Sequence, residues 1–366
     1  MERVVAIADQ AGEDVDVLIV QGMHPEMGMV HSARVNALML KALDAELVLV
    51  AAPSDQTAAE VAETIAIAAR GYGALSDGRA VGAILNRVCD RKGASAEAEV
   101  DSFGPSSGGC GACAPTGLSE ECLKEHRAAL EAEGIRPIAI VPCNADLMSP
   151  RVKDIGDALR AQFLYTGEAA SRRVRDVAIC AMTVPNAMKA MKPGTLVLTP
   201  GDRSDILLAA AMTVQSGTPL AGVVLTGGLG PDRGVLDLCR KVFDAGLPLL
   251  QVKASSYRAA AQVASMNPTI PIDDADRVER TMSFVADHVE LGWARAFAKP
   301  ARVPRLSPPA FRHRLVETAK ADVKRIVLPE GAEPRTVAAA SIVAARGIAR
   351  CVLLGNPDEV RDVAGR

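Results

Sequence analysis

The stretch from Leu306 to Pro357, LSPPAFRHRLVETAKADVKRIVLPEGAEPRTVAAASIVAARGIARCVLLGNP, decides the fold class of the C-terminal part of this chain. Its Ser-Pro-Pro opening cannot continue a helix, so a new unit begins there. The pattern predicts a helix over PAFRHRLVETAK, a short buried strand over Ile326–Leu328 and an Ala-rich helix over about 335–346. Gly347 ends that helix, and a second strand is predicted over Cys351–Leu354. This order predicts a βαβ unit, with which a parallel sheet begins.

Three segments of this stretch, LSPPAFRHRLVETA, KRIVLPEGAEPRTVAAA and GIARCVLLGNP, resemble the start of the catalytic domain of the phosphate acetyltransferase (phosphotransacetylase) family. The resemblance is to the long bacterial form, which carries two further domains upstream. It implies transfer of an acetyl group between coenzyme A and inorganic phosphate, with acetyl-CoA as a substrate and no covalently bound cofactor. The family's Asp base, its Ser and its phosphate-binding Arg residues lie later in the catalytic domain. The resemblance therefore implies a fragment that has no catalytic residue of its own and is inactive alone.

Composition sets the broad class of the protein. The 366 residues are enough for two or three domains, and 49% hydrophobic with 23% charged residues is ordinary for a globular chain. A net charge of −3 gives no reason to expect nucleic acid or an acidic membrane surface as a partner. No signal peptide or membrane-spanning run is evident, and eight scattered cysteines favour a reducing compartment. We expect a cytoplasmic protein.

The first 145 residues alternate between strand and helix patterns, which predicts a parallel α/β layer. The run DVLIV at 16–20 is continuous and apolar, as in a central parallel strand. Further strands are predicted at 47–51, 81–85 and 137–141, and helices at 32–43, 57–69 and 119–132.

A nucleotide site in this layer is not supported by its motifs. The chain has no Gly-Lys dipeptide, so a G-x-x-x-x-G-K-[ST] loop is absent, and no G-x-G-x-x-G fingerprint occurs. DVLIVQG and AVGAILNR resemble strands of P-loop proteins related to dethiobiotin synthetase, but the first strand, P-loop and helix of that fold are not in this chain. We therefore expect a structural layer and no tight triphosphate binding.

The Gly- and Ser-rich loop at 90–117 contains two cysteines, and a third cysteine and a histidine follow on the next predicted helix. Cys110, Cys113, Cys122 and His126 have the spacing C-x2-C-x8-C-x3-H, which could supply four zinc ligands. The spacing matches no common zinc module, so we expect no metal. The alternative is an insertion with exposed thiols.

A second α/β pattern follows a predicted charged helix at 151–162. The segments RRVRDVAICAM, GDRSDILLAA, LTGG and AGLPLLQV resemble the DRTGG domain over about 174–295, with the motif split between GDRSD and LTGG. The resemblance implies a regulatory or assembly role and supplies no catalytic residue. Strands are predicted at 174–180, 195–199, 220–225 and 248–252, and helices at 184–190, 206–215 and 234–245.

Two strand ends in this region carry candidate effector- or anion-binding residues: Asp202, Arg203, Asp205, Thr226, Gly227 and Gly228. The first three lie at a strand-to-helix corner, where free backbone amides can hold an anion. The others follow the next strand, at the edge where open α/β sheets bind ligands. The alternative interpretation is a set of turn and cap residues, with Asp205 as the helix N-cap and the glycines serving tight corners.

In the last unit, Glu330 and Arg335 lie beyond the first strand, where they could line a cleft with an Arg for an anion. The alternative is that both residues cap or salt-bridge the following Ala-rich helix.

The sequence thus predicts two parallel-sheet, three-layer α/β domains followed by an incomplete βαβ start of a third. We place the boundaries at 1–149, 150–300 and 301–366. Two functions remain open: a phosphate acetyltransferase by descent that lacks most of its active site, or a regulatory and assembly protein. The second would bind a small effector or a separate catalytic chain. We expect either a homo-oligomer or association with a catalytic chain.

Overall fold

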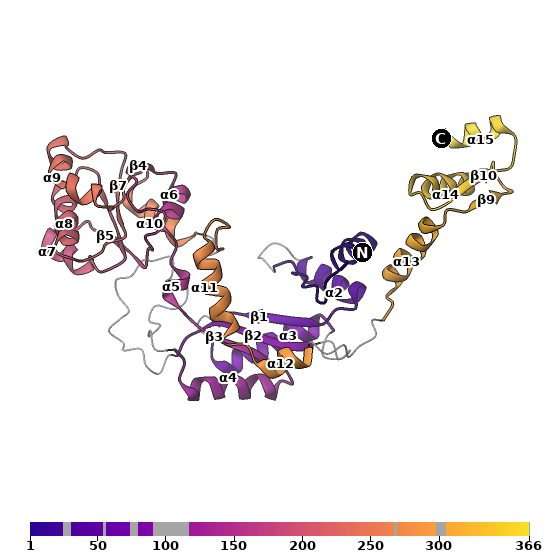
Figure 1. Cartoon of the computed structure of the whole chain (residues 1–366), viewed down its shortest axis with the longest axis horizontal. Helices are drawn as coiled ribbons and strands as arrows, with labels where there is room; N and C mark the ends of the chain where they lie inside the picture. The colour runs from indigo at the N-terminus through magenta and orange to yellow at the C-terminus, as the bar shows by residue number, and fades with distance from the viewer. Residues whose placement is uncertain are drawn as a thin grey trace. The chain divides into compact units, whose positions relative to one another are not determined.

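The computed structural model describes residues 1–24, 31–53, 56–73, 80–90, 117–266, 269–297 and 305–365. Helices and strands alternate along most of the chain (Figure 1). In chain order they are α1 (Glu2–Ala11), α2 (Ser32–Leu43), β1 (Leu47–Ala51), α3 (Ala58–Gly71), β2 (Ala80–Val88), α4 (Glu120–Ala132), β3 (Pro137–Pro142), α5 (Ala145–Met148), α6 (Val152–Leu159), β4 (Gln162–Tyr165), β5 (Asp176–Ile179), α7 (Val184–Ala187), the 3-10 helix η3 (Met188–Ala190), β6 (Thr195–Pro200), α8 (Ser204–Gln215), β7 (Gly222–Thr226), α9 (Arg233–Asp244), β8 (Leu249–Gln251), α10 (Ser256–Ala264), α11 (Ala275–Ala286), α12 (Leu291–Phe297), α13 (Pro308–Ala321), β9 (Arg325–Leu328), α14 (Pro334–Ala345), β10 (Arg350–Leu353) and α15 (Pro357–Ala364).

The chain divides into two compact units. One comprises Met1–Val48, Ala66–Val81 and Lys299–Arg366, and the other comprises Leu49–Ile65 and Gly82–Ala298. The α/β class predicted from the sequence is confirmed, because parallel strand pairs joined by helices occur in both units.

The largest sheet has five strands in the order β4-β8-β7-β6-β5. Strands β5 to β8 are parallel to one another, as predicted. The edge strand β4, which the sequence did not indicate, is antiparallel to β8. The predicted helix at 151–162 ends early, because Arg160 adopts a left-handed conformation at the C-cap of α6 and the chain then turns into β4.

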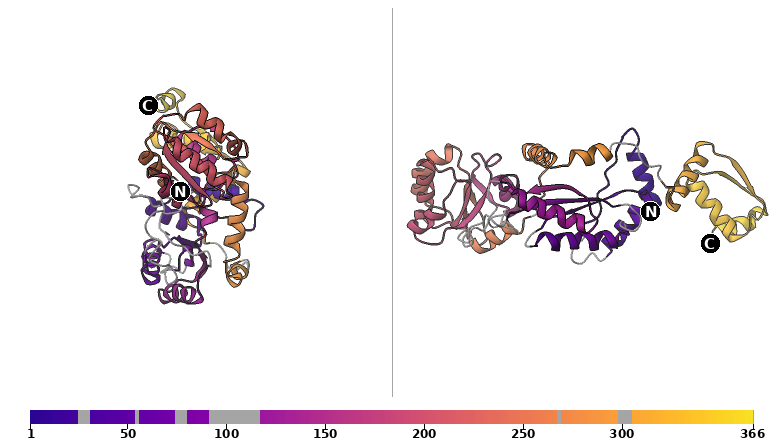
Figure 2. Two further views of the ribbon diagram at one scale, coloured as in Figure 1. Left: turned by 90° about the vertical axis from the view of Figure 1, so that its left-hand side faces the viewer. Right: turned by 90° about the horizontal axis from the view of Figure 1, so that it is seen from below.

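Helices cover both faces of this sheet (Figures 1 and 2). Helices α7, α8 and α9 contribute to the hydrophobic core on one face, and α6 and α10 contribute to the core on the other. Successive residues of β6 point to opposite faces, so Val197 lies in the first core while Leu196 and Leu198 lie in the second. Burial on both faces explains why the strands read as continuous apolar runs.

A smaller sheet has the strand order β1-β2-β3, with β2 and β3 parallel. It confirms the strands predicted at 47–51, 81–85 and 137–141. The strand predicted at 16–20 is wrong: these residues form no strand, and Ile19 is 89% exposed. An apolar run forms a strand only when a neighbouring strand accepts its backbone hydrogen bonds, and no described strand pairs with this run.

The βαβ unit predicted near the C-terminal end is confirmed. Strands β9 and β10 pair in parallel, with Ile326 opposite Cys351 and Val327 opposite Val352. Helix α13 begins where Ser307 caps it, since the Ser307 hydroxyl accepts a hydrogen bond from the Ala310 amide. Ile326, Val327 and Val352 remain exposed in the described part of the chain. Two parallel strands alone thus leave apolar surface uncovered.

None of the helices that the structure describes is both long enough and apolar enough to cross a membrane.

Close packing of α6 on the sheet gives a stability prediction. A Cβ atom on Gly156 would lie 2.5 Å from Cζ of Phe163 and 3.0 Å from Cδ2 of Leu250. We expect Gly156→Ala to lower the free energy of unfolding by about 1–3 kcal/mol through overpacking. Gly292→Ala in α12 is the matched control, because nothing lies within 4 Å of its added Cβ. Urea unfolding of both variants measures the difference, and equal stabilities would contradict the packing argument.

Candidate functional site

The two predicted motifs of the DRTGG-like region meet at one edge of the five-stranded sheet. Gly201–Asp205 follow β6, while Thr226 ends β7, the neighbouring strand in the sheet, and Gly227 and Gly228 follow it. The Gly201 amide donates a hydrogen bond of 3.1 Å to the Thr226 carbonyl. A Cβ on Gly201 would lie 1.9 Å from the carbonyl oxygen of Leu229, so only glycine fits there.

Arg203 ties this corner to the loop that follows β5. Its Nη1 and Nη2 donate to the carbonyls of Ala181 and Met182, at 3.0 and 2.9 Å. Its Nε and Nη2 each donate to the Asp205 carboxylate at 2.8 Å. Hydrogen bonding to Arg203 is the main reason that the pKa of Asp205 is lowered. Most of the Arg203 donors are therefore already used within the protein.

The Thr226-Gly227-Gly228 turn is closed in the same way. Both glycines have positive φ, +80° and +70°, and their amides donate to the carbonyls of Ala254 and Val252 at 2.8 and 2.9 Å. The buried Thr226 hydroxyl lies 2.7 Å from the Ser256 hydroxyl. The backbone donors of this turn hold the segment after β8 in place.

At the start of α8, the predicted N-cap is wrong in detail. Arg203 occupies the N-cap position and Asp205 lies in the first turn. The amides of Arg203 and Ser204 donate to the carbonyls of Pro200 and Asp202 at 3.0 Å. Asp202 is exposed. The corner thus has the contacts of turn and cap residues, and its amides are engaged inside the protein.

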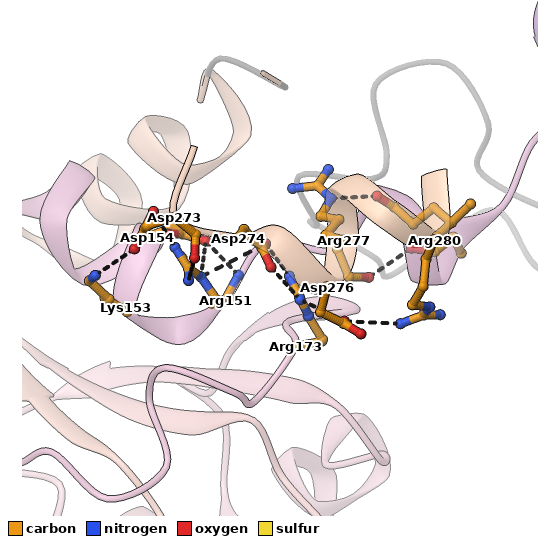
Figure 3. A network of polar contacts seen from close by, with 12 residues as sticks. Arg151, Lys153, Asp154, Arg173, Asp273, Asp274, Asp276, Arg277 and Arg280 are labelled. Atoms are coloured by element: carbon orange, nitrogen blue, oxygen red, sulfur yellow. Dashed lines mark hydrogen bonds and ion pairs between the residues drawn. The ribbon is translucent and has the colours of Figure 1, made fainter. Parts of the chain in front are cut away.

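A second polar cluster, which the sequence did not reveal, joins both ends of the DRTGG-like region (Figure 3). Arg151 Nη2 lies 2.7 Å from Asp154 Oδ1 and 2.9 Å from Asp273 Oδ1. Arg173 Nη2 lies 2.7 Å from Asp274 Oδ1. The side chains of Arg151 and Asp274 are only 7% and 3% exposed. We call Arg151, Lys153, Asp154, Arg173, Asp273, Asp274, Asp276 and Arg280 the ion cluster.

The ion cluster strongly perturbs its carboxylates. Hydrogen bonds from Lys153 and then Arg151 lower the pKa of Asp273 to about 2. A hydrogen bond from Arg173 lowers the pKa of Asp274. One contact had a local signal, because Asp154 is the third residue of α6 and its carboxylate accepts from the Arg151 amide at 2.9 Å. Asp276 and Arg280 are also close in sequence, four residues apart on α11. The pairs that join Arg151, Lys153 and Arg173 to Asp273, Asp274 and Asp276 are more than a hundred residues apart, so no spacing could have indicated them.

In the C-terminal unit, the structure does not join the two cleft candidates. Arg335 is 94% exposed, and its Nε donates to Glu333 at 2.9 Å. Glu333 is the N-cap of α14, and its carboxylate also accepts from the Thr336 amide at 2.9 Å. Glu330 is exposed and has no recorded side-chain contact among the described residues. Arg335 thus forms an ion pair at the helix start, with a different glutamate from the one considered.

Of the four candidate metal ligands, Cys110 and Cys113 lie outside the described residues. Cys122 Sγ and His126 Nδ1 are 3.6 Å apart. His126 Nδ1 lies 2.9 Å from the Cys122 carbonyl, to which it must donate, so only Nε2 remains for a metal. Within the described ranges, no group of three or more His, Cys, Asp or Glu is arranged to hold a metal ion.

The cysteines include both thiols and a disulfide. Cys180 and Cys239 are buried thiols, and burial raises the pKa of Cys180 to about 11. Such thiols are poor nucleophiles at neutral pH. Cys89, in contrast, is disulfide-bonded, whereas the sequence favoured a reducing compartment over a disulfide framework.

Three protein-family models match successive parts of the chain. A model of the DRTGG domain matches residues 154–266, and a model described as phosphate acetyl/butaryl transferase matches residues 310–365. A model of an AAA domain matches residues 1–151. These matches agree in order with the architecture that the sequence predicted.

Several proteins that match this chain over its full length are named phosphate acetyltransferase. A phosphate acetyltransferase of Pseudomonas aeruginosa is 42% identical over 365 residues, which cover 100% of this chain and 49% of that protein. Over its full length, the chain is similar to bacterial phosphate acetyltransferases. Those of Salmonella typhimurium and Escherichia coli are 34% and 33% identical, with 100% of this chain and 50% of each protein covered. The chain thus spans about half the length of these relatives.

One solved structure is also similar, at low resemblance. It is the crystal structure of the CBS and DRTGG domains of the regulatory region of Clostridium perfringens pyrophosphatase, in complex with the activator diadenosine tetraphosphate. The identity is 16% and the TM-score 0.28, with 67% of this chain and 90% of that chain covered. A likeness this distant says nothing about ligands of the present chain.

The ion cluster gives a first mutational prediction. Arg151→Met would leave Asp154 and Asp274 with fewer partners in a buried setting, so we expect a loss of about 3–5 kcal/mol in the free energy of unfolding. The matched control is Arg240→Met, which breaks an exposed pair with Asp237 on α9 and should cost about 0–1 kcal/mol. Denaturant unfolding compares them. A similar small loss in both variants would mean that the cluster contributes little.

The lowered pKa of Asp273 gives a pH prediction. A carboxylate whose pKa is lower in the folded state stabilises the fold above its unfolded pKa, near 4, and this contribution disappears as the pH falls toward 2. We expect the unfolding midpoint of the wild-type chain to fall across that window, and Asp273→Asn to flatten part of the decline. Asp237→Asn, in the exposed pair on α9, is the control. Parallel pH profiles for wild type and Asp273→Asn would rule out this linkage.

Proposed function

We propose that the chain functions within a phosphate acetyltransferase, which transfers the acetyl group of acetyl-CoA to inorganic phosphate and releases coenzyme A and acetyl phosphate. The support is the relatives' shared name and the transferase match at 310–365. Coenzyme A enters as part of a substrate. The relatives extend about twice as far, so this activity is assigned to the whole enzyme.

We further propose that these 366 residues do not catalyse the reaction alone. The chemistry requires a base for the thiol, donors for the developing oxyanion and a cationic clamp for phosphate. In the described C-terminal unit, Arg335 is exposed and paired with Glu333, and Glu330 does not contact it. The exposed apolar strands β9 and β10 need further chain, in the same or another polypeptide, to cover them.

The role we assign to the residues themselves is regulatory and structural. We place an N-terminal α/β layer at 1–149, a DRTGG-like regulatory domain at 150–300 and the beginning of the transferase domain at 301–366. The corner of Asp202, Arg203, Asp205, Thr226, Gly227 and Gly228 would act by fixing three loops of the DRTGG-like domain together. A small effector at this corner would have to bind through side chains such as Asp202, because the amides are engaged.

Assembly and location follow from the same role. The uncovered strands favour association, either between copies of the chain or with a catalytic chain. The buried thiols Cys180 and Cys239 support a reducing, cytoplasmic location, although Cys89 is disulfide-bonded.

A second function remains open, in which the chain is a non-catalytic regulatory and assembly protein that binds a small effector or a separate catalytic chain. The observation that favours it is the DRTGG match, which covers a complete five-stranded domain. Limited proteolysis distinguishes the two functions. A protease-resistant region 305–365 in the isolated chain favours a self-sufficient protein, whereas rapid cleavage there favours a unit that another part of an enzyme completes.

The activity proposal has a direct assay. We expect purified 1–366 to release no coenzyme A from acetyl-CoA and phosphate above the buffer rate, measured with a thiol reagent. The phosphate acetyltransferase of Escherichia coli serves as positive control under the same conditions. Sustained, phosphate-dependent turnover by the 366-residue chain would contradict its proposed inactivity.

A further inference from the structure

One buried cation beside the ion cluster, Arg277, has no anionic partner among the described residues. Arg277 lies in the first turn of α11 and is only 6% exposed. Its Nε donates to the Leu147 carbonyl at 2.6 Å. Neither Nη group makes a hydrogen bond or ion pair with any residue that the structure describes. The four N–H donors of the two Nη groups therefore have no partner among the described residues, and neither Nη atom is a fully buried unsatisfied atom, so both can be reached from solvent.

The charges around it are already matched. The ion cluster contains four cations and four carboxylates, which pair with one another. Arg277 is thus the positive charge left over. Figure 3 shows its guanidinium on the side of α11 that faces away from Asp276.

An unpaired buried charge is costly, and a charged group whose pKa is perturbed by burial is a candidate for a functional site. Burial is the largest effect on Arg277 and lowers its pKa, while the nearby Arg173 and Arg151 lower it further. Only Asp274 and Asp154 oppose this, and neither is within ion-pair distance. The surroundings therefore favour the arrival of a negative group over the loss of the proton.

We propose that Arg277 anchors a small-oxyanion site, in which both Nη groups donate to two oxygens of one carboxylate or phosphate group. The planar guanidinium fork matches two oxygens of either group. Because so little of the residue is exposed, the bound group must be small or must be the end of a slender molecule. This site is separate from the DRTGG corner and does not rest on the acetyltransferase proposal.

Binding is tested on the full 366-residue chain with inorganic phosphate, acetate and chloride at equal ionic strength. We expect phosphate or acetate to raise the thermal unfolding midpoint more than chloride does, and titration calorimetry to detect the same oxyanion. Arg277→Met should abolish the difference between oxyanion and chloride. Arg280→Met, one turn further along α11 in a half-exposed ion pair with Asp276, should preserve it. The two probes distinguish a phosphate from a carboxylate ligand.

Arg277→Lys keeps the charge but loses the fork, so it tests the geometry even if Arg277→Met fails to fold. We expect oxyanion binding at least about tenfold weaker in Arg277→Lys, with the fold intact by circular dichroism. Wild-type affinity in Arg277→Lys, an unchanged oxyanion response in Arg277→Met, or no oxyanion response beyond chloride in the wild-type chain would each overturn the proposal.

Discussion

The DRTGG-like region depends on the buried pairing of Arg151 and Arg173 with Asp274. Arg151 precedes α6, Arg173 lies between β4 and β5, and Asp274 immediately precedes α11, so the pairing ties the start of the region to the segment that leads into α11. Removing charges from water costs several kcal/mol each, and the cost is offset only when each partner is well matched. Asp274 meets this condition because both guanidinium groups reach it. The ion cluster therefore holds the two ends of the DRTGG-like region in one arrangement.

The sheet edge illustrates a second constraint on function. Open α/β sheets bind ligands beyond the carboxyl ends of their strands because turns there leave backbone amides free. Here the amides of Gly201, Gly227 and Gly228 donate to neighbouring carbonyls. Most of the Arg203 donors are likewise hydrogen-bonded within the protein. The motif residues consequently make a rigid corner. A rigid corner of this kind would suit a regulatory or structural domain, because the loops that it joins would move together.

Sequence reasoning worked where local patterns decide the outcome. The βαβ unit at 325–353 and the strands of the five-stranded sheet follow from apolar runs bounded by turns. It did not indicate β4, because an edge strand of four residues has little pattern, and it placed a strand at 16–20, with which no described strand pairs. The polar sites differ for the same reason: the corner residues were named from their motif, whereas Asp273 and Arg277 depend on partners more than a hundred residues away.

Arg277 and the ion cluster show two solutions to one problem within a single helix turn. Asp274 and Asp276 are engaged by protein cations, while the Nη donors of Arg277 have no partner among the described residues. A ligand that binds the folded chain and not the unfolded one stabilises the fold in proportion to its occupancy. Arg277 contacts Leu147 in α5 from its place on α11, so an oxyanion there would strengthen the contact between these two helices without any new protein contact. Such a site would let the concentration of a small metabolite control how firmly α11 is held.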